Sequence, residues 1–285
     1  MPAQTVYHTN EALFQAYHLL QPGDIVLGRL RLRASEESLV ADLLSRNIHL
    51  IPSGLSQLAS RSKCLQVALF GKEFLAPLTM AIHDKHDMQQ ALARYGHHCK
   101  QAVITKLDRK NAGLGVCKWS SVEEVYNAAT LQTLPFPFVL QPYLANCRDI
   151  RVILLGAHYR EAYERINVLN FRNNLHFGGE SRPFQLSAEI EKFCHRVMQR
   201  GQFPYAHLDL LLFPDGKLFL NEINLRGGMR GADIEKQKYY VPLDKFAQEQ
   251  VKAVYKNGIL KVTIPPKEDT TVNEGIKIEI IKEGE

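Results

Sequence analysis

The chain has 285 residues, of which 45% are hydrophobic, enough to fill the core of one large domain or two smaller ones. No apolar run reaches the roughly 18 residues of a membrane-spanning helix, and the N-terminus lacks the charged-then-apolar layout of a signal peptide. The net charge of +5 suits an anionic ligand such as a nucleotide but does not indicate nucleic acid. We therefore expect a cytoplasmic globular protein that binds neither nucleic acid nor a membrane.

The cysteine pattern argues against disulfides and zinc. Five widely spaced cysteines occur, an odd number, and no two of them form a CxxC pair. We expect reduced thiols, mostly buried.

Strand and helix signals alternate along the first half of the chain. The opening sixty residues predict a small α/β unit with a strand at 24–30, a helix at 35–46 capped by Ser35, and a strand at 48–51. The next elements follow the same alternation: a helix from about 63, a strand at 78–82, a helix at 85–95, a strand at 102–107, a helix at 121–129 and a strand at 138–143.

From residue 149 the pattern changes to long paired strands. Two such strands precede a polar segment, a helix at 187–200 and an acidic hairpin. A helix at 243–255 and a strand at 259–264 are expected next. After Pro265-Pro266 the tail is polar and acid-rich, with a segment, GIKIEII, that suits an edge strand or an ordered arm.

The acidic hairpin, residues 206–226, carries an aspartate and a glutamate on two apolar runs. A two-residue loop at Asp215-Gly216 places Asp209 directly opposite Glu222, with Asn224 on the same face. Neighbouring carboxylates repel each other unless a cation bridges them, and two carboxylates plus an amide oxygen suit Mg2+. A three-residue loop would shift the register by one and break this pairing. A pair of surface acids in an ordinary hairpin is the alternative.

Lys106 ends a predicted strand and precedes a flexible segment that contains Gly113 and Gly115. Glycines allow backbone N–H groups to approach a ligand, and a lysine supplies a point charge for phosphoryl oxygens. This pattern favours a phosphate lid, although a plain turn would also explain it. No Walker loop is present.

The segment Gln141-Pro142-Tyr143 lies between two apolar strands. A proline there breaks a ladder hydrogen bond and frees a backbone group to face a ligand, as a hinge between subdomains requires. An edge strand followed by a loop fits the composition equally well.

Two further polar loops contain arginines. Arg165 precedes a turn-rich polar loop that contains Arg172 and Asn174, and arginine matches phosphate bidentately. Arg226 opens a glycine-rich loop after the hairpin and is placed to grip a carboxylate substrate. Ordinary surface arginines are the alternative.

In this order, the motifs resemble the ATP-grasp superfamily over about residues 63–234, closest to its RimK and bacterial glutathione synthetase branch. The matching positions are Lys106, Gly113, Gly115 and Val116 in the lid; Gln141, Tyr143 and Leu144 in the hinge, followed by Asp149 to Val152; Arg172, Asn174, Leu175, Gly178 and Gly179 in the loop; and Asp209, Glu222, Ile223 and Asn224 in the metal signature.

The chain departs from the family pattern at several positions. Lys110 stands in place of the first lid glycine, and Leu107 replaces the usual proline. Pro142 takes a position that glutamate often fills in this branch, which calls a side-chain contact to the nucleotide there into question. The sequence Arg226-Gly227-Gly228 replaces the Ser-Pro that often follows the asparagine. The N-terminal unit is also shorter than the usual substrate-binding domain.

The resemblance implies an α+β (α/β) ATP-grasp fold, in which two α+β subdomains clasp ATP. It implies a short N-terminal α/β unit at 1–62, an ATP-grasp domain at 63–264 and a polar C-terminal tail at 265–285. Residues 63–144 form the first subdomain with the phosphate lid, and residues 145–264 form the second with the metal site.

The resemblance also implies the roles of individual residues. Lys63 and Lys106 contact the ATP phosphates, with the lid glycines beside them. The remaining implied roles are adenine binding by Gln141, Pro142, Tyr143 and Leu144; Mg2+ binding, with Mn2+ as a substitute, by Asp209, Glu222 and Asn224; and catalysis by Arg165, Arg172, Asn174 and Arg226.

The implied activity is an ATP- and Mg2+-dependent ligation of a carboxylate to an amine through an acyl phosphate, which forms an amide or peptide bond. The carboxylate belongs to a small molecule or a peptide. The short N-terminal unit leaves a homo-oligomer or a partner subunit open. Two alternatives remain: an ATP-binding regulatory or scaffold protein that has lost the ligase reaction, and phosphoryl transfer to another acceptor.

Overall fold

The computed structural model describes residues 5–33, 35–98, 100–111, 113–156, 159–168, 170–172, 178–229, 231–232 and 276–277. The chain divides into two compact units, residues 1–57 with 235–285, and residues 58–234. The first unit holds one sheet and the second holds two. Within the described ranges, no helix has the length and hydropathy to cross a membrane.

The sheet of the first unit has the strand order β13-β1-β2-β3, in which β1, β2 and β3 run parallel and β13 is an antiparallel edge strand. Its strands are β1 (Thr5–Tyr7), β2 (Ile25–Leu27), β3 (His49–Ile51) and β13 (Ile276–Lys277). Its helices are α1 (Asn10–Gln15), η1 (Tyr17–Leu19) and α2 (Ser38–Ser45), and α3 (Gly54–Ala59) leads into the second unit.

Helix α2 begins later than the sequence predicts, and the predicted cap at Ser35 is wrong. Glu37 takes the N-cap position, but its side chain forms no capping hydrogen bond, whereas Ser35 has a φ of 73° in the preceding turn. The carboxylate of Glu36 accepts a hydrogen bond from the backbone N–H of Arg33 at 2.6 Å. This local bond stabilises a turn, so the backbone becomes helical only after it.

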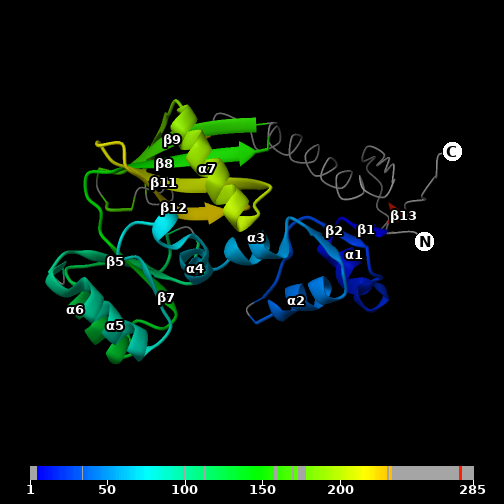
Figure 1. Ribbon diagram of the computed structural model, residues 1–285, viewed down its shortest axis with the longest axis horizontal. Coiled ribbons are helices and arrows are strands. Elements are labelled where there is room, and N and C mark those ends of the chain that lie inside the picture. The colour runs from blue at the N-terminus through cyan, green and yellow to red at the C-terminus, as the bar shows by residue number, and fades with distance from the viewer. Residues whose placement is uncertain are drawn as a thin grey trace. The chain divides into compact units, whose positions relative to one another are not determined.

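The first sheet of the second unit is antiparallel, in the order β4-β7-β5-β6, and helices α5 and α6 cover one face of it (Figure 1). Its elements are β4 (Met80–Ile82), α5 (Lys85–Tyr95), η2 (Gly96–His98), β5 (Val103–Leu107), β6 (Val116–Trp119), α6 (Val122–Thr130) and β7 (Phe138–Pro142). Buried apolar residues from both helices, including Met88 and Val125, pack with Phe138 and Leu140 of β7. This core holds β5, the strand that carries Lys106.

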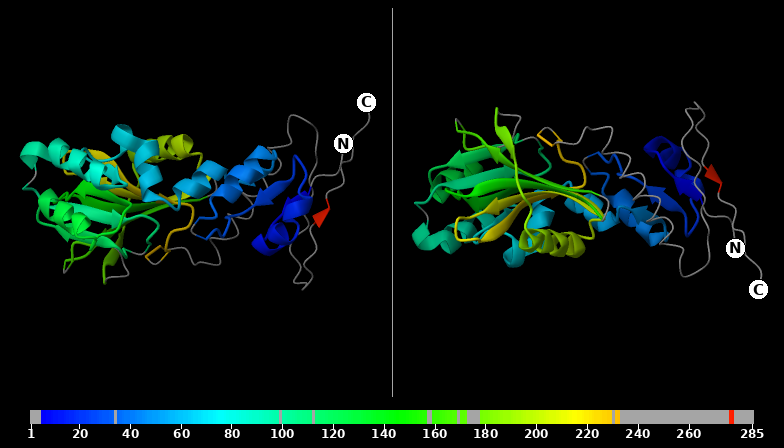
Figure 2. Two further views of the ribbon diagram at one scale, coloured as in Figure 1. Left: turned by 90° about the horizontal axis from the view of Figure 1, so that it is seen from below. Right: turned by 90° about the horizontal axis from the view of Figure 1, so that it is seen from above.

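The second sheet of this unit is antiparallel, in the order β10-β9-β8-β11-β12. Its elements are β8 (Arg148–Leu155), β9 (Tyr159–Ile166), β10 (Glu180–Pro183), α7 (Ala188–Gly201), β11 (Tyr205–Leu212) and β12 (Leu218–Asn224). Helix α7, yellow-green in Figure 2, lies along one face of this sheet and buries Ile190, Cys194 and Val197. Because α7 covers that face, polar side chains can gather on the other.

Helix α4 (Lys63–Phe74) packs against both sheets of the second unit. It contacts β4 and β7 of the first sheet and β12 of the second. The hydroxyl oxygen of Ser62 caps the helix by accepting a hydrogen bond from the backbone N–H of Leu65 at 3.0 Å. Just after the helix, Leu75 forms an isolated parallel bridge with Leu220 of β12. Helix α4 therefore brings Lys63 to the edge of β12.

Several predictions fall outside the described residues. These are the role of Asn174, the helix at 243–255, the strand at 259–264 and most of the tail. Among the five cysteines, Cys99 also lies outside, and the other four are free thiols. Burial raises the pKa of the Cys64 and Cys194 thiols to about 12, so both are neutral.

Candidate active site

Strands β11 and β12 form a hairpin in which Asp209 lies directly opposite Glu222, as the sequence predicts. The predicted two-residue loop is wrong. Phe213 donates a backbone hydrogen bond to Lys217 at 2.9 Å, which leaves three residues, 214–216, in the loop. Gly216 takes a φ of 83°, the left-handed conformation that ends a three-residue hairpin loop.

A β-bulge at Asn221 reconciles this loop with the observed pairing. Leu210 pairs with Leu220 on the loop side, and the next pair is Asp209 with Glu222, so Asn221 has no partner on β11. The three-residue loop shifts the register by one residue, and the bulge shifts it back. The pairing is therefore right although the loop length was not.

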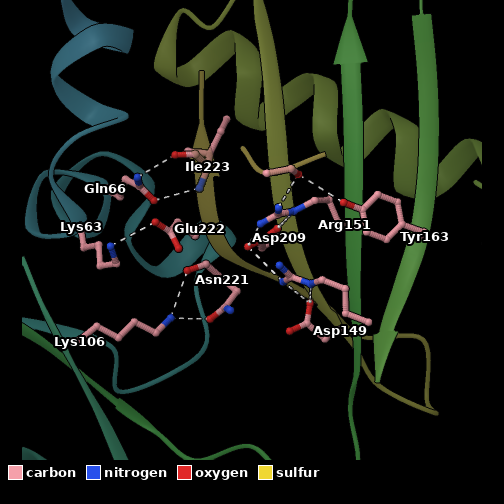
Figure 3. Close-up of polar contacts among 12 residues, drawn as sticks. Lys63, Gln66, Lys106, Asp149, Arg151, Tyr163, Asp209, Asn221, Glu222 and Ile223 are labelled. Carbon is pink, nitrogen blue, oxygen red and sulfur yellow. Dashed lines mark hydrogen bonds and ion pairs between the residues drawn. The ribbon is translucent and has the colours of Figure 1, made fainter. Parts of the chain in front are cut away.

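Two arginines from the neighbouring strands hold Asp209. Arg151 lies opposite Asp209 on β8 and donates from Nε and Nη2 to its two oxygens at 2.7 and 2.8 Å (Figure 3). Arg165 of β9 lies 3.1 Å from Asp209 and also donates to Asp149, at 3.0 Å from its Nε. Asp209 is thus paired with two guanidinium groups.

The electrostatics of this cluster keep Asp209 anionic. Burial disfavours its charged form, but Arg151 and Arg165 outweigh burial and hold the pKa of Asp209 well below its ordinary value. Burial raises the pKa of Asp149, and Arg165 offsets only part of that effect. Of Asp149 and Asp209, Asp209 is therefore the carboxylate whose charged form the arginines stabilise more strongly.

Glu222 contacts the lysine at the start of α4. The Nζ atom of Lys63 lies 3.2 Å from Oε1 of Glu222 and donates to the backbone carbonyl of Lys110 at 2.6 Å. Lys110 belongs to the predicted phosphate lid, and the carboxylate of Asp108 in the same segment accepts from the backbone N–H of Cys64 at 3.1 Å. The predicted lid is therefore fastened to the N-terminus of α4.

The predicted lid glycines shape the turn between β5 and β6. Gly113 and Gly115 have φ values of 75° and 72°, which side-chain-bearing residues rarely adopt. A Cβ on Gly115 would lie 2.9 Å from Cβ of Leu107, whose backbone N–H donates to the carbonyl of Gly115 at 3.0 Å. Leu107, which replaces the usual proline, thus packs directly on the second lid glycine.

Lys106 reaches from β5 across to the bulge. Its Nζ donates to Oδ1 of Asn221 at 2.6 Å and lies 3.3 Å from the backbone carbonyl oxygen of the same residue. The side chain is buried, and burial lowers the pKa of Lys106 to about 8, so the ammonium form still dominates at neutral pH. Lys106 and Lys63 both point toward β12 (Figure 3).

A small pocket, open to solvent, lies between α4, the β4-β7-β5-β6 sheet and the β11–β12 hairpin. Its walls combine apolar side chains with a few polar ones, which is typical of small-molecule sites. The apolar members are Val67, Leu75, Ala76, Val139, Leu211 and Leu220, and the polar members are Lys63, Gln66, Thr79, Lys106, Gln141 and Asn221.

Of the four predicted hinge residues, Gln141 lines this pocket. Pro142 is the last residue of β7, and the backbone N–H of Tyr143 continues the strand pairing by donating to the carbonyl of Ala102 at 2.9 Å. The Tyr143 ring lies under the ammonium of Lys118, 3.6 Å from Nζ to the ring centroid. The carbonyl of Leu144 accepts from a cysteine thiol at 3.3 Å.

The predicted catalytic arginines lie in different surroundings. Arg165 is buried among the carboxylates. Arg172, in the segment between β9 and β10, donates to the backbone carbonyl of Val116 at the start of β6. Arg226 is exposed in the loop after β12. Among these three, the structure describes a contact with Asp209 for Arg165.

The predicted metal ligands fit a hard divalent cation by donor type. Asp209, Glu222 and Asn224 share one face of the hairpin and present carboxylate and amide oxygens, which Mg2+ prefers. Both oxygens of Asp209 also bind Arg151, so a metal would share this carboxylate with the guanidinium. Within the described residues, no group of three or more His, Cys, Asp or Glu side chains could hold a metal.

Sequence reasoning missed Arg151, Asn221 and Gln66 as parts of the site. The alternation of Asp149 and Arg151 on one strand face could have indicated Arg151. Asn221 and Gln66 gave no local signal, because their partners lie 115 and 157 residues away in the chain.

The outer edge of β12 is covered by side chains from the residues around α4 and from β5. Gln66 exchanges hydrogen bonds with the backbone of Ile223, and the backbone N–H of Leu225 donates to the hydroxyl of Ser60 at 2.9 Å. Lys106 covers the backbone carbonyl of Asn221. These contacts follow the strand at every second residue and fix it against the pocket.

Two family models match the chain. One, described as RimK-like ATP-grasp domain, matches residues 59–239. The other, Hsp20/alpha crystallin family, matches residues 234–281. The first match covers the pocket, both lysines and the acidic hairpin.

Similar curated proteins include two bacterial enzymes. A probable alpha-L-glutamate ligase of Klebsiella pneumoniae (strain 342) is 27% identical over 181 residues, which cover 61% of this chain and 58% of that protein. A glutathione synthetase of Agrobacterium fabrum (strain C58 / ATCC 33970) is 27% identical over 157 residues, 50% of this chain and 47% of that protein. The chain spans between 34% and 59% of the length of the curated relatives it matches.

A similar solved structure is the ADP complex of an N5-carboxyaminoimidazole ribonucleotide synthetase. It has a TM-score of 0.56 and 13% sequence identity, and the match covers 79% of this chain and 59% of that one. At this identity the likeness shows the fold, which is the fold that the sequence predicts.

Proposed function

Because this chain belongs to the RimK-like ATP-grasp family, we propose that it is an ATP-dependent ligase that joins a carboxylate to an amine in an amide or peptide bond. One observation carries the proposal. Lys63 and Lys106 reach the hairpin strand β12 from one side, and the carboxylates of Asp209 and Glu222 lie on the hairpin itself. The two lysines line one pocket, and the two carboxylates lie on the hairpin strands beside it, an arrangement that supports phosphate binding next to a metal site.

The pocket supports nucleotide binding in two ways. Its apolar walls suit the faces of an adenine ring, and Gln141 supplies an amide that can pair with the ring edge. Lys63 and Lys106 would bind the phosphates, because both ammonium groups line the same pocket. Lys106 bonds to two neutral oxygens of Asn221, and Lys63 contacts the Glu222 carboxylate and the Lys110 carbonyl. Each ammonium has three N–H groups, so each keeps a donor for phosphate oxygens.

The proposed chemistry activates the carboxylate. The γ-phosphoryl group passes to a carboxylate oxygen of the substrate, and ADP leaves. The amine nitrogen then attacks the acyl carbon, loses a proton, and inorganic phosphate leaves. Arg165 and Arg151 lie beside Asp209, where they would balance the charge that develops on the transferred group. Arg226, in the exposed loop after β12, would bind the substrate carboxylate.

Mg2+, when bound by Asp209, Glu222 and Asn224, would neutralise the phosphate charge during transfer. The lid segments 107–115 and 166–180 would exclude water from the acyl phosphate, which water otherwise hydrolyses. Arg172, in the second segment, donates to the carbonyl of Val116, the residue that directly follows the first. We propose that this contact helps them act as one cover.

We propose a division of the chain at residues 62, 144 and 264. The first subdomain would hold the lysines, and the second would hold the carboxylates. The proposed domain, 63–264, extends past residue 239, where the RimK-like match ends, into the range of the Hsp20 match. Limited proteolysis with mass spectrometry would locate the boundary.

Two assays test the function. A thermal shift with MgATP measures nucleotide binding, which stabilises any binder by mass action. ADP release with pooled carboxylates and amines then measures ligation, which a regulatory or scaffold protein would not perform. We expect both signals in the wild type. A shift without ADP release would favour the scaffold alternative, and ADP release that needs no amine would favour another phosphoryl acceptor.

The variants Asp209→Asn and Glu222→Gln should abolish ADP release while the fold is retained. Asp215→Asn is the matched control, because Asp215 lies on the same hairpin but is exposed and pairs with Lys217. Undiminished metal-dependent ADP release in both hairpin variants would contradict the proposed site.

A further inference from the structure

Asn221 is an insertion in an otherwise regular hairpin. Leu210 pairs with Leu220, and unbroken pairing from the three-residue loop would place Asn221 opposite Asp209. The bulge leaves Asn221 without a partner on β11 and brings Glu222 opposite Asp209. Bulges near active sites commonly redirect a side chain, so the contacts of Asn221 indicate its role.

Those contacts are with Lys106. The side-chain Oδ1 of Asn221 accepts from Lys106 Nζ at 2.6 Å, and the backbone oxygen of Asn221 lies 3.3 Å from the same nitrogen. A buried ammonium is costly unless its N–H groups are hydrogen-bonded. One residue of the bulge therefore offers two acceptors to a lysine on the other sheet.

The chemistry of the acceptor also matters. Asn221 is neutral, so it orients the ammonium without cancelling its charge. An aspartate at this position would form an ion pair and would repel an incoming phosphate. The carboxamide leaves the full positive charge of Lys106 facing a pocket that Asn221 itself lines.

We propose that Asn221 is a positioning residue that fixes the ammonium of Lys106 in the pocket for nucleotide phosphates. The inference rests on the proposed function, because it takes the pocket to be the nucleotide site. Asn221 acts through Lys106, so its effect on nucleotide affinity disappears when Lys106 is removed. The bulged residue thus orients a lysine of β5, a strand of the other sheet.

A double-mutant cycle tests this inference through MgADP affinity, measured by titration calorimetry. The variants are Asn221→Leu, Lys106→Met and the combination of both. A hydrogen bond to a charged group contributes enough that Asn221→Leu should weaken MgADP binding by about tenfold. In the Lys106→Met background the same change should have an effect of roughly twofold or less. Equal effects in both backgrounds, or no effect in either, would overturn the proposal.

A nucleotide-free measurement separates this inference from the proposed function. Lysine acylation, followed by peptide mass spectrometry, reports how freely each amine reaches solvent. Asn221→Leu should raise the labelling rate of Lys106 by about tenfold, as expected for loss of a charge-assisted hydrogen bond, while the rate at Lys63 stays as in the wild type. Lys63 serves as the internal control, because its own partners are Glu222 and Lys110.

The outcomes are distinct. Wild-type protein that binds no MgADP but shows the Lys106 labelling change would contradict the proposed function and retain the positioning contact. An unchanged labelling rate at Lys106 would overturn the positioning contact. If Asn221→Leu does not fold, Asn221→Gly carries the same two tests, because glycine suits a bulge and keeps the backbone acceptor while it removes Oδ1.

Discussion

Gln66 of α4 lies against Ile223 of β12 and exchanges two hydrogen bonds with its backbone. The N–H of Ile223 donates to Gln66 Oε1 at 3.1 Å, and Gln66 Nε2 donates to the carbonyl of Ile223 at 2.9 Å (Figure 3). Ile223 lies between Glu222 and Asn224, two of the three proposed metal ligands. This buried glutamine thus fixes the strand on which those ligands stand.

We expect Gln66→Leu to lower the free energy of unfolding by about 2–4 kcal/mol, because it leaves buried backbone groups of Ile223 without partners. It should also weaken Mn2+ binding, which electron paramagnetic resonance measures without turnover. Gln90→Leu on α5 is the control, since Gln90 is exposed. Loss of stability with unchanged Mn2+ affinity would restrict Gln66 to a structural role.

The buried ammonium of Lys106 should lower the free energy of unfolding at neutral pH. Burial lowers its pKa from 10.5 to about 8, so between these values the unfolded chain binds more protons than the folded one. Stability should therefore rise as the pH rises through this window. Lys106→Met should remove that rise and increase the free energy of unfolding at pH 7 by up to about 3 kcal/mol. Urea unfolding at pH 7 and pH 9 measures both effects.

The matched control is Lys72→Met, because Lys72 lies exposed on α4. It should leave the pH dependence as in the wild type. A Lys106→Met variant that is less stable than the wild type at pH 7 would mean that the contact with Asn221 outweighs the cost of burial. MgADP affinity should fall in Lys106→Met whatever happens to stability, which is the trade-off expected of an active-site residue.

The hairpin shows what local sequence can and cannot predict. The alternation of apolar residues correctly indicates which side chains share a face. The predicted pairing of Asp209 with Glu222 assumes a two-residue loop, and it is found because the bulge at Asn221 offsets a three-residue one. The dipeptide Asp215-Gly216 does not determine the loop length, because a left-handed glycine ends a three-residue loop as readily as it completes a two-residue one. Asn221, the bulged residue, bonds to a lysine 115 residues away, and no local pattern reveals that contact.

The helices show the same division. The predicted starts of α4, α6 and α7, near residues 63, 121 and 187, agree with the structure, in which Ser62, Ser121 and Ser187 cap these helices. Ser35 fails as a cap because the Glu36 carboxylate bonds the backbone of the preceding turn. The fold follows from periodicity and caps, whereas the partners of Arg151 and Gln66 follow from how the sheets pack.

Arg165 should be among the least replaceable residues of the second sheet. It is buried between Asp149 and Asp209, and removing it leaves two buried carboxylates with less compensation. Breaking a buried ion pair by removing one partner costs about 3–5 kcal/mol, so Arg165→Leu should lower the free energy of unfolding by that amount. Arg148→Leu, in the more exposed pair with Glu164, should cost about 1 kcal/mol or less. Chemical denaturation compares the two, and equal losses would contradict the burial argument.

Two adjacent glycines in the loop after β12, Gly227 and Gly228, should differ in how much stability is lost when each is replaced by alanine. A Cβ on Gly227 would lie 2.6 Å from Nδ1 of His207, whereas a Cβ on Gly228 would lie 3.9 Å from the guanidinium of Arg151. His207 is buried and cannot move aside freely, and burial lowers its pKa to about 3, so it is neutral. Gly227→Ala should therefore lower stability by about 1–3 kcal/mol through overpacking. Gly228→Ala adds only an ordinary contact and should cost about 0.5 kcal/mol or less.

Because His207 pairs with Asn224 across the hairpin, the strain in Gly227→Ala should also reach the proposed metal ligands and weaken Mn2+ binding. Similar stability and Mn2+ affinity in the two alanine variants would show that His207 yields, and that this loop does not depend on a close approach at Gly227.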